Sequence, residues 1–132
     1  MMKRSKLFLI EDDEAIRTTF QICLEAEGYD VESFENGSLA LERLHKVPEP
    51  CLILLDFMMP IMNGTEFMEE FSSLPATVIP VPVYLCSATA SPIESKNMGC
   101  MGFIKKPVDL DILLRIVKNY CPPIHAGLAA SL

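Results

Sequence analysis

The sequence predicts an α/β domain in which five parallel strands form one sheet with helices on both faces. Strand-like and helix-like segments alternate strictly along the 132 residues. The segment LILL, residues 52–55, is apolar at every position, which is typical of a strand buried on both sides of a parallel sheet. Because parallel crossovers are right-handed, this alternation favours a doubly wound sheet.

Apolar periodicity predicts a first helix over residues 14–27. Ile16 begins a series of apolar residues that ends at Leu24 and recurs at the spacing of one helix face. Gly28 then follows as a helix stop.

The other helices are predicted mainly from their boundary residues. Asn36 opens the second helix, Gly64 the third and Asp109 caps the last. The segment 91–99, SPIESKNMG, has room for only a short helix between Pro92 and its final glycine. The strand candidates are residues 6–10, 29–34, 51–55, 83–88 and 102–106.

Composition limits the function classes. The net charge of −7 and the pI near 4.7 argue against direct binding of nucleic acid, because phosphates would be repelled. No apolar run approaches the length of a membrane span or a signal-peptide core, so we expect a cytoplasmic protein that does not enter the membrane. Residues 1–121 are predicted to form one domain, and 122–132 a short flexible tail.

The five cysteines have no C-x-x-C spacing. Their number is odd, and two of them lie in apolar runs. This pattern favours buried, reduced thiols in a cytosolic protein over a disulfide framework.

Charged and polar residues stand where the strands end. Glu11 and Asp12 follow the first strand, Asp56 the third, Ser87 ends the fourth and Lys106 the fifth. In an open parallel sheet these ends meet at one edge, where ligands bind. Crowded carboxylates repel one another, and a single lysine leaves the cluster negative, so a divalent cation is the natural complement.

These motifs together resemble the receiver domain of bacterial response regulators. They are the acidic pair Glu11–Asp12, LLDFMMPIMNG around Asp56, CSA at 86–88 and KKP at 105–107, and the resemblance extends from residue 5 to about 120. It implies a flavodoxin-like receiver fold with strand order 2-1-3-4-5.

The resemblance also implies a phosphoacceptor site with a bound metal. Asp56 would take a phosphoryl group from a phosphohistidine, which makes the chain a signalling switch rather than a metabolic enzyme. Mg²⁺ (or Mn²⁺) would be held by Asp12, Asp56 and the backbone carbonyl of Met58, with Glu11 holding the metal's waters.

Further roles follow from the same resemblance. Lys106 would pair with Asp56 and then with a phosphoryl oxygen, and the peptide bond to Pro107 would be cis. Ser87 would donate a hydrogen bond to the phosphoryl group. Phe103 matches the aromatic switch residue, but it has no hydroxyl group and can couple only through steric contact. The segment from Ser87 to Phe103 is also about one helical turn shorter than expected.

The implied partners are a histidine kinase or a histidine phosphotransfer domain, and a downstream protein effector or a fused output domain. A homodimer is possible. Small and apolar residues on the first helix and beside Lys106 are the predicted docking surface for the phosphoryl donor. They are Ala15, Ile16, Thr19, Ile22 and Pro107.

Two other functions fit part of the pattern. A small Mg²⁺-dependent phosphatase with an aspartate nucleophile would want a second aspartate two residues after the first, and the Glu11-Asp12-Asp13 run does not start with such a pair. The other alternative is a receiver-like binding module without phosphotransfer, although each acidic, hydroxyl and lysine position is filled.

Overall fold

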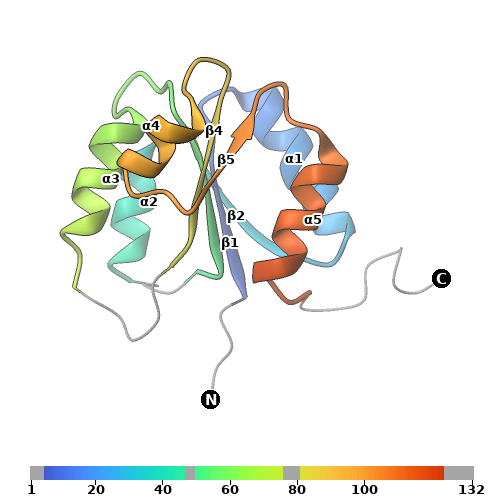
Figure 1. Ribbon diagram of the computed structural model, residues 1–132. Coiled ribbons are helices and arrows are strands. Elements are labelled where there is room, and N and C mark those ends of the chain that lie inside the picture. Colours follow the sequence, from blue (N-terminus) through green and yellow to red (C-terminus); the bar gives the residue numbers. More distant parts are fainter. Residues whose placement is uncertain (1–4, 47–49, 76–80, 124–132) are drawn as a thin grey trace.

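The computed structural model describes residues 5–46, 50–75 and 81–123, and it confirms the expected fold (Figure 1). Five parallel strands form one sheet in the order β2-β1-β3-β4-β5. The strands are β1 (Lys6–Ile10), β2 (Asp30–Phe34), β3 (Leu52–Asp56), β4 (Val83–Ser87) and β5 (Gly102–Lys105). The helices are α1 (Glu14–Ala26), α2 (Gly37–Leu44), α3 (Gly64–Ser72), α4 (Pro92–Asn97) and α5 (Leu110–Tyr120).

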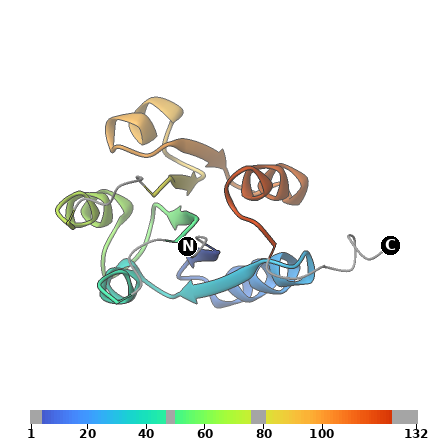
Figure 2. The same ribbon diagram turned by 90° about the horizontal axis from the view of Figure 1, so that it is seen from below.

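Helices cover both faces of the sheet. Figure 2 shows α1 and α5 on one side, and α2, α3 and α4 on the other. Alternate residues of β3 therefore enter different cores: Ile53 and Leu55 pack toward α2 and α3, while Leu52 and Leu54 pack toward α1 and α5. Burial on both sides explains why this strand has no polar residue before Asp56.

Side-chain caps begin the helices where the sequence suggested. The carboxylate of Asp13 accepts from the backbone N–H of Ile16 at 3.0 Å, and Asn36 and Asp109 cap α2 and α5 in the same way. On α1, Leu24 is fully buried, whereas Ile16 is 37% exposed. Ile16 lies in the first turn of α1.

The helices are short. The longest one described, α1, has 13 residues. Within the described ranges, no helix has both the length and the apolar character that crossing a membrane requires. From residue 124 onward, the predicted tail lies outside the described residues.

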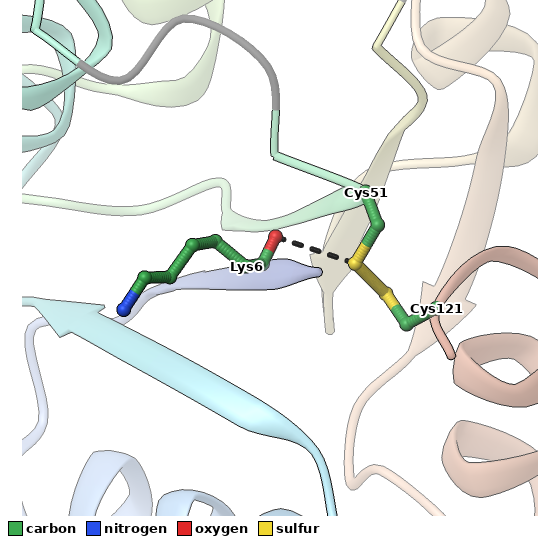
Figure 3. The surroundings of a disulfide bond; sticks show 3 residues. All are labelled: Lys6, Cys51 and Cys121. Carbon is green, nitrogen blue, oxygen red and sulfur yellow. Dashed lines mark hydrogen bonds between the residues drawn. A yellow bond between two sulfur atoms is a disulfide. The ribbon is translucent and has the colours of Figure 1, made fainter. Parts of the chain in front are cut away.

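The prediction of reduced cysteines is wrong for two of the five. Cys51, just before β3, and Cys121, just after α5, form a disulfide with a Cα–Cα distance of 5.3 Å (Figure 3). Cys23, Cys86 and Cys100 are free. The sequence did not suggest this pair because 70 positions separate the two cysteines. The fold joins them because α5 runs antiparallel to the strands and returns the chain to the edge where β3 begins.

The ring of Tyr84, on the neighbouring strand β4, leaves no room for a side chain at position 102. A Cβ atom at Gly102 would lie 2.3 Å from Cε2 of Tyr84, whose hydroxyl is held 3.2 Å from that of Tyr120. We expect Gly102→Ala to lower the free energy of unfolding by about 1 kcal/mol, measured by urea denaturation. The double variant Gly102→Ala/Tyr84→Leu tests the cause. If the alanine costs as much without the ring as with it, crowding by Tyr84 is not the reason.

Candidate functional site

Three carboxylates meet at the carboxyl edge of the sheet. β1 and β3 are hydrogen-bonded neighbours with Ile10 opposite Leu55, so Glu11 and Asp56 emerge side by side. One oxygen from each of Glu11, Asp12 and Asp56 lies within 4.8 Å of the others. Glu11 and Asp56 are buried, whereas Asp12 is exposed at the mouth of the cluster.

Lys106 joins two of these acids. Its Nζ donates to Oδ1 of Asp56 at 2.8 Å and to Oε1 of Glu11 at 3.0 Å. Lys105, one position earlier, is the last residue of β5 and is exposed. The Lys106–Pro107 peptide bond is cis, as the resemblance implied. The hydrogen bond from Lys106 to Glu11 was not predicted, because the resemblance implied only that Glu11 holds the metal's waters.

The cluster makes ionisation of Asp56 harder than in a free carboxyl group. Burial is the main cause and raises the pKa of Asp56 to about 7; Lys106 opposes this increase, while Asp12 and Glu11 add to it. For Lys106, burial acts to lower the pKa, but the carboxylates of Asp56 and Glu11 outweigh burial, so the pKa is raised. Among the described groups, Lys106 alone therefore does not offset the effects of burial and of the two neighbouring carboxylates on the pKa of Asp56.

Backbone and side-chain hydrogen bonds fix the loop that carries Glu11 and Asp12. Oε2 of Glu11 accepts from the backbone N–H of Asp13 at 3.1 Å. Nη1 of Arg17 donates to the carbonyl oxygen of Glu11 at 2.8 Å. Sequence reasoning missed Arg17. The only available signal was a cation one helical turn after Asp13, and such residues are common on solvent-exposed helix faces.

The turn after Asp56 is held by a close backbone approach at Gly64. Its N–H donates to the carbonyl of Phe57 at 2.9 Å, and an added Cβ would lie 3.2 Å from Cα of Phe57. Asn63 and Glu66 form a capping box at the start of α3. The side chain of Met58 is 65% exposed, so nothing in the core holds it, and the role of its carbonyl stays a prediction.

Ser87 is buried, and its hydroxyl oxygen is already engaged within its own loop. Oγ accepts from the backbone N–H groups of Thr89 at 3.0 Å and Ala90 at 2.8 Å. Oγ also lies 3.4 Å from Oγ1 of Thr89, and either of these two hydroxyls can be the donor in that contact. Phe103 lies on β5 opposite Leu85 and is partly buried against the core on the α2 and α3 side of the sheet.

The predicted docking residues lie at the surface beside this edge. Ile22 is 62% exposed and Ile16 is 37% exposed. The smaller members of the set, Ala15, Thr19 and Pro107, are exposed as well. Their role in docking is not tested by their position.

The donor set fits a hard divalent cation. When all three carboxylates are ionised, they and the ammonium group of Lys106 carry a net charge of −2, and all the anionic donors are oxygen atoms. Mg²⁺ and Mn²⁺ prefer such ligands. A cation would also offset the mutual repulsion that contributes to the raised pKa of Asp56.

Comparison with known proteins decides the family. The family model described as "Response regulator receiver domain" matches residues 7–118. The chain belongs to this family. As a receiver domain, it is a signalling domain of two-component systems, and the fold described above is that of solved receiver domains.

Three relatives illustrate the match. The chain is 35% identical to the "Transcriptional regulatory protein CpxR homolog" of Haemophilus influenzae, over 85% of this chain and 48% of that protein. It is 28% identical to "Sporulation initiation phosphotransferase F" of Bacillus subtilis, over 92% of this chain and 97% of that protein. The solved receiver domain of the Francisella response regulator 1452 superposes with a TM-score of 0.77 at 26% identity, covering 88% and 95% of the two chains.

The receiver domain accounts for only part of several relatives. The chain spans about half the length of the first curated relatives that it matches, at 54%, 48% and 52%. Those relatives are named as transcriptional regulators, whereas the Bacillus protein is matched over nearly its whole length. The family is therefore shared by proteins with and without a long additional segment.

Proposed function

We propose that Asp56 of this receiver domain accepts a phosphoryl group from a phosphohistidine donor. The observation that carries the proposal is the pair of hydrogen bonds from Lys106 to Asp56 and Glu11 inside an acidic cluster. This arrangement holds a nucleophilic carboxylate next to a fixed cation at the open edge of the sheet. Phosphoryl transfer depends mainly on positioning and on charge stabilisation, and these contacts supply both.

In this proposal a carboxylate oxygen of Asp56 attacks phosphorus as the bond from phosphorus to the donor nitrogen breaks. The product is an acyl phosphate on Asp56, a covalent intermediate of nucleophilic catalysis. Lys106 keeps Asp56 oriented before transfer and then contacts a phosphoryl oxygen. Glu11 retains its hydrogen bond to Lys106, so the lysine stays anchored when Asp56 changes.

We also propose that Asp12 and Asp56 hold Mg²⁺ (or Mn²⁺), with the Met58 carbonyl as a further ligand and Glu11 holding the metal's waters. A bound divalent cation would neutralise charge on the phosphoryl oxygens and favour the ionised form of Asp56. The exposed position of Asp12 places one of these carboxylates where a hydrated ion can enter.

The switch and the partners are part of the same proposal. Ser87 would donate a hydrogen bond to the phosphoryl group. This contact would pull on the loop that ends at Ala90, because the N–H of Ala90 donates to the Ser87 hydroxyl oxygen. Phe103 would respond by steric contact. A histidine kinase or phosphotransfer domain would dock on the α1 residues beside Asp12, and an effector or fused output domain would receive the signal. A cytoplasmic location belongs to this proposal as well.

Treatment with acetyl phosphate and Mg²⁺, followed by intact mass measurement, tests the assignment of Asp56. We expect one acid-stable and base-labile phosphoryl group on the wild type, and none on Asp56→Asn. Asp111→Asn is the control, because Asp111 is exposed in the first turn of α5 and should leave labelling unchanged. Equal labelling of Asp56→Asn would assign the phosphoryl group to another residue. Continuous turnover of a phosphomonoester would instead favour a phosphatase.

Removal of one carboxylate from the cluster should weaken metal binding. We expect Asp12→Asn to lower the affinity for Mg²⁺ by about tenfold or more, measured by isothermal titration calorimetry at neutral pH. Asp13→Asn is a matched control, since Asp13 caps α1 and an asparagine caps equally well. Equal affinities of these two variants would show that Asp12 is not a ligand.

A further inference from the structure

We propose that Cys51 and Cys121 form a reversible dithiol–disulfide pair that fastens the C-terminal end of α5 to the sheet in a redox-dependent way. The pair lies at the edge of the sheet opposite Asp56. Figure 3 shows Cys51 at the start of β3 and Cys121 at the end of α5, joined through their sulfur atoms. This inference does not depend on the proposed phosphotransfer.

The surroundings suit both oxidation states of Cys51. Its Sγ lies 3.3 Å from the carbonyl oxygen of Lys6, which also accepts the backbone N–H of Cys51 at 2.8 Å (Figure 3). A disulfide sulfur has no hydrogen to donate, so this is a plain contact in the oxidised state. After reduction, the thiol can donate a hydrogen bond to the same carbonyl. After reduction, the thiol of Cys51 therefore still has a hydrogen-bond partner in the buried interior.

The end of α5 is the part that reduction would release. Cys121 is the C-cap residue, its N–H donates to the carbonyl of Val117 at 2.8 Å, and Pro123 beyond it is exposed. Besides the disulfide, a contact between the hydroxyls of Tyr84 and Tyr120 at 3.2 Å holds this last turn. Helix ends fray first, so a buried Cys121 can still become accessible by local opening.

Two of the three free thiols, Cys86 and Cys100, are poor competitors for oxidation. Burial raises the pKa of Cys86 to about 12, and burial also raises the pKa of Cys100. Neither forms a thiolate readily, and the thiolate is the reactive species. Exchange with a small disulfide such as oxidised glutathione supplies the oxidant. One protein thiol displaces a glutathione thiol to form a mixed disulfide, and the second displaces the other. One S–S bond replaces another, and both thiol protons end on the two released glutathiones.

Thiol counting tests the pairing. The full chain is equilibrated with oxidised glutathione or with dithiothreitol, then denatured in iodoacetamide and weighed. We expect three alkylated cysteines after oxidation, namely the free Cys23, Cys86 and Cys100, and five after reduction. Peptide mapping of the oxidised chain should join Cys51 to Cys121. Five labels after oxidation, or a different pairing, would overturn the proposal.

The effect on α5 is tested by stability and hydrogen exchange in both redox states. Closing a loop with a sequence separation of 70 restricts the unfolded chain, so we expect oxidation to raise the melting temperature by about 10 °C. Backbone amides near the end of α5 should exchange at least tenfold faster after reduction. Both differences should disappear in Cys121→Ala and in Cys51→Ala, and persist in Cys23→Ala.

The comparison is made between redox states of each variant, so a general loss of stability does not affect it. Two alanine variants are included in case one of them folds poorly, and the wild type alone is informative in either event. Equal melting temperatures and equal exchange of the oxidised and reduced wild type would show that the pair does not fasten α5. A redox effect that survives in both Cys121→Ala and Cys51→Ala would assign it to other cysteines.

Discussion

Replacing Lys106 with methionine is expected to slow the phosphorylation of Asp56 by acetyl phosphate by about 100-fold. Methionine keeps much of the side-chain volume but removes the ammonium group that donates to Asp56 at 2.8 Å and to Glu11 at 3.0 Å. Loss of one fixed donor to a developing charge typically costs a factor of this size. The rate is measured by intact mass over time at saturating Mg²⁺, so that any change in metal affinity does not contribute.

Lys105 provides a matched control for this experiment. It has the same charge and is the adjacent residue, but it is exposed at the end of β5 and has no side-chain contact with the described acids. Lys105→Met should react within about twofold of the wild type. Lys106→Arg should recover only part of the rate, because a guanidinium differs from an ammonium in shape. If Lys106→Met reacts as fast as Lys105→Met, the lysine has no part in transfer.

The fold could be predicted from the sequence because the strongest signals in the sequence are local. The apolar run before Asp56 and the caps at Asp13, Asn36 and Asp109 each depend on neighbouring residues only. Parallel pairing then brings the strand ends to one edge, so the positions of Glu11, Asp56 and Lys106 follow from the topology. Helical spacing alone does not separate buried from exposed apolar residues on α1, where Leu24 is fully buried and Ile16 is 37% exposed.

Features that depend on side-chain direction could not be predicted in this way. The bond from Lys106 to Glu11 requires a lysine rotamer that no spacing indicates. The hydroxyl of Ser87 folds back on its own loop, although its place at a strand end was recognised. The Cys51–Cys121 pair depends on the direction and length of α5, which set where the chain returns to the sheet. Each feature is a contact across the fold rather than a property of a segment.

In a chelator, Asp56→Asn is expected to be more stable than the wild type by about 2 kcal/mol at neutral pH. Burial is the main reason that the pKa of Asp56 is raised from 3.8 to about 7, so ionising this group in the folded protein is unfavourable. Asparagine has a similar shape and carries no charge. The expected gain is smaller than the pKa difference alone implies, because solvent and the other charged groups at the sheet edge moderate the effect.

The pH dependence identifies the cause of this gain. A carboxyl group whose pKa is higher in the folded than in the unfolded state stabilises the fold below about pH 4, and this contribution is lost as the pH rises toward 7. The advantage of Asp56→Asn over the wild type, measured by urea denaturation, should therefore be small near pH 4 and grow up to about pH 7. Saturating Mg²⁺ should reduce it, because binding to the ionised wild-type cluster stabilises the fold. Asp111→Asn should show neither trend. A constant difference across this pH range would mean that the ionisation of Asp56 does not destabilise the acidic edge.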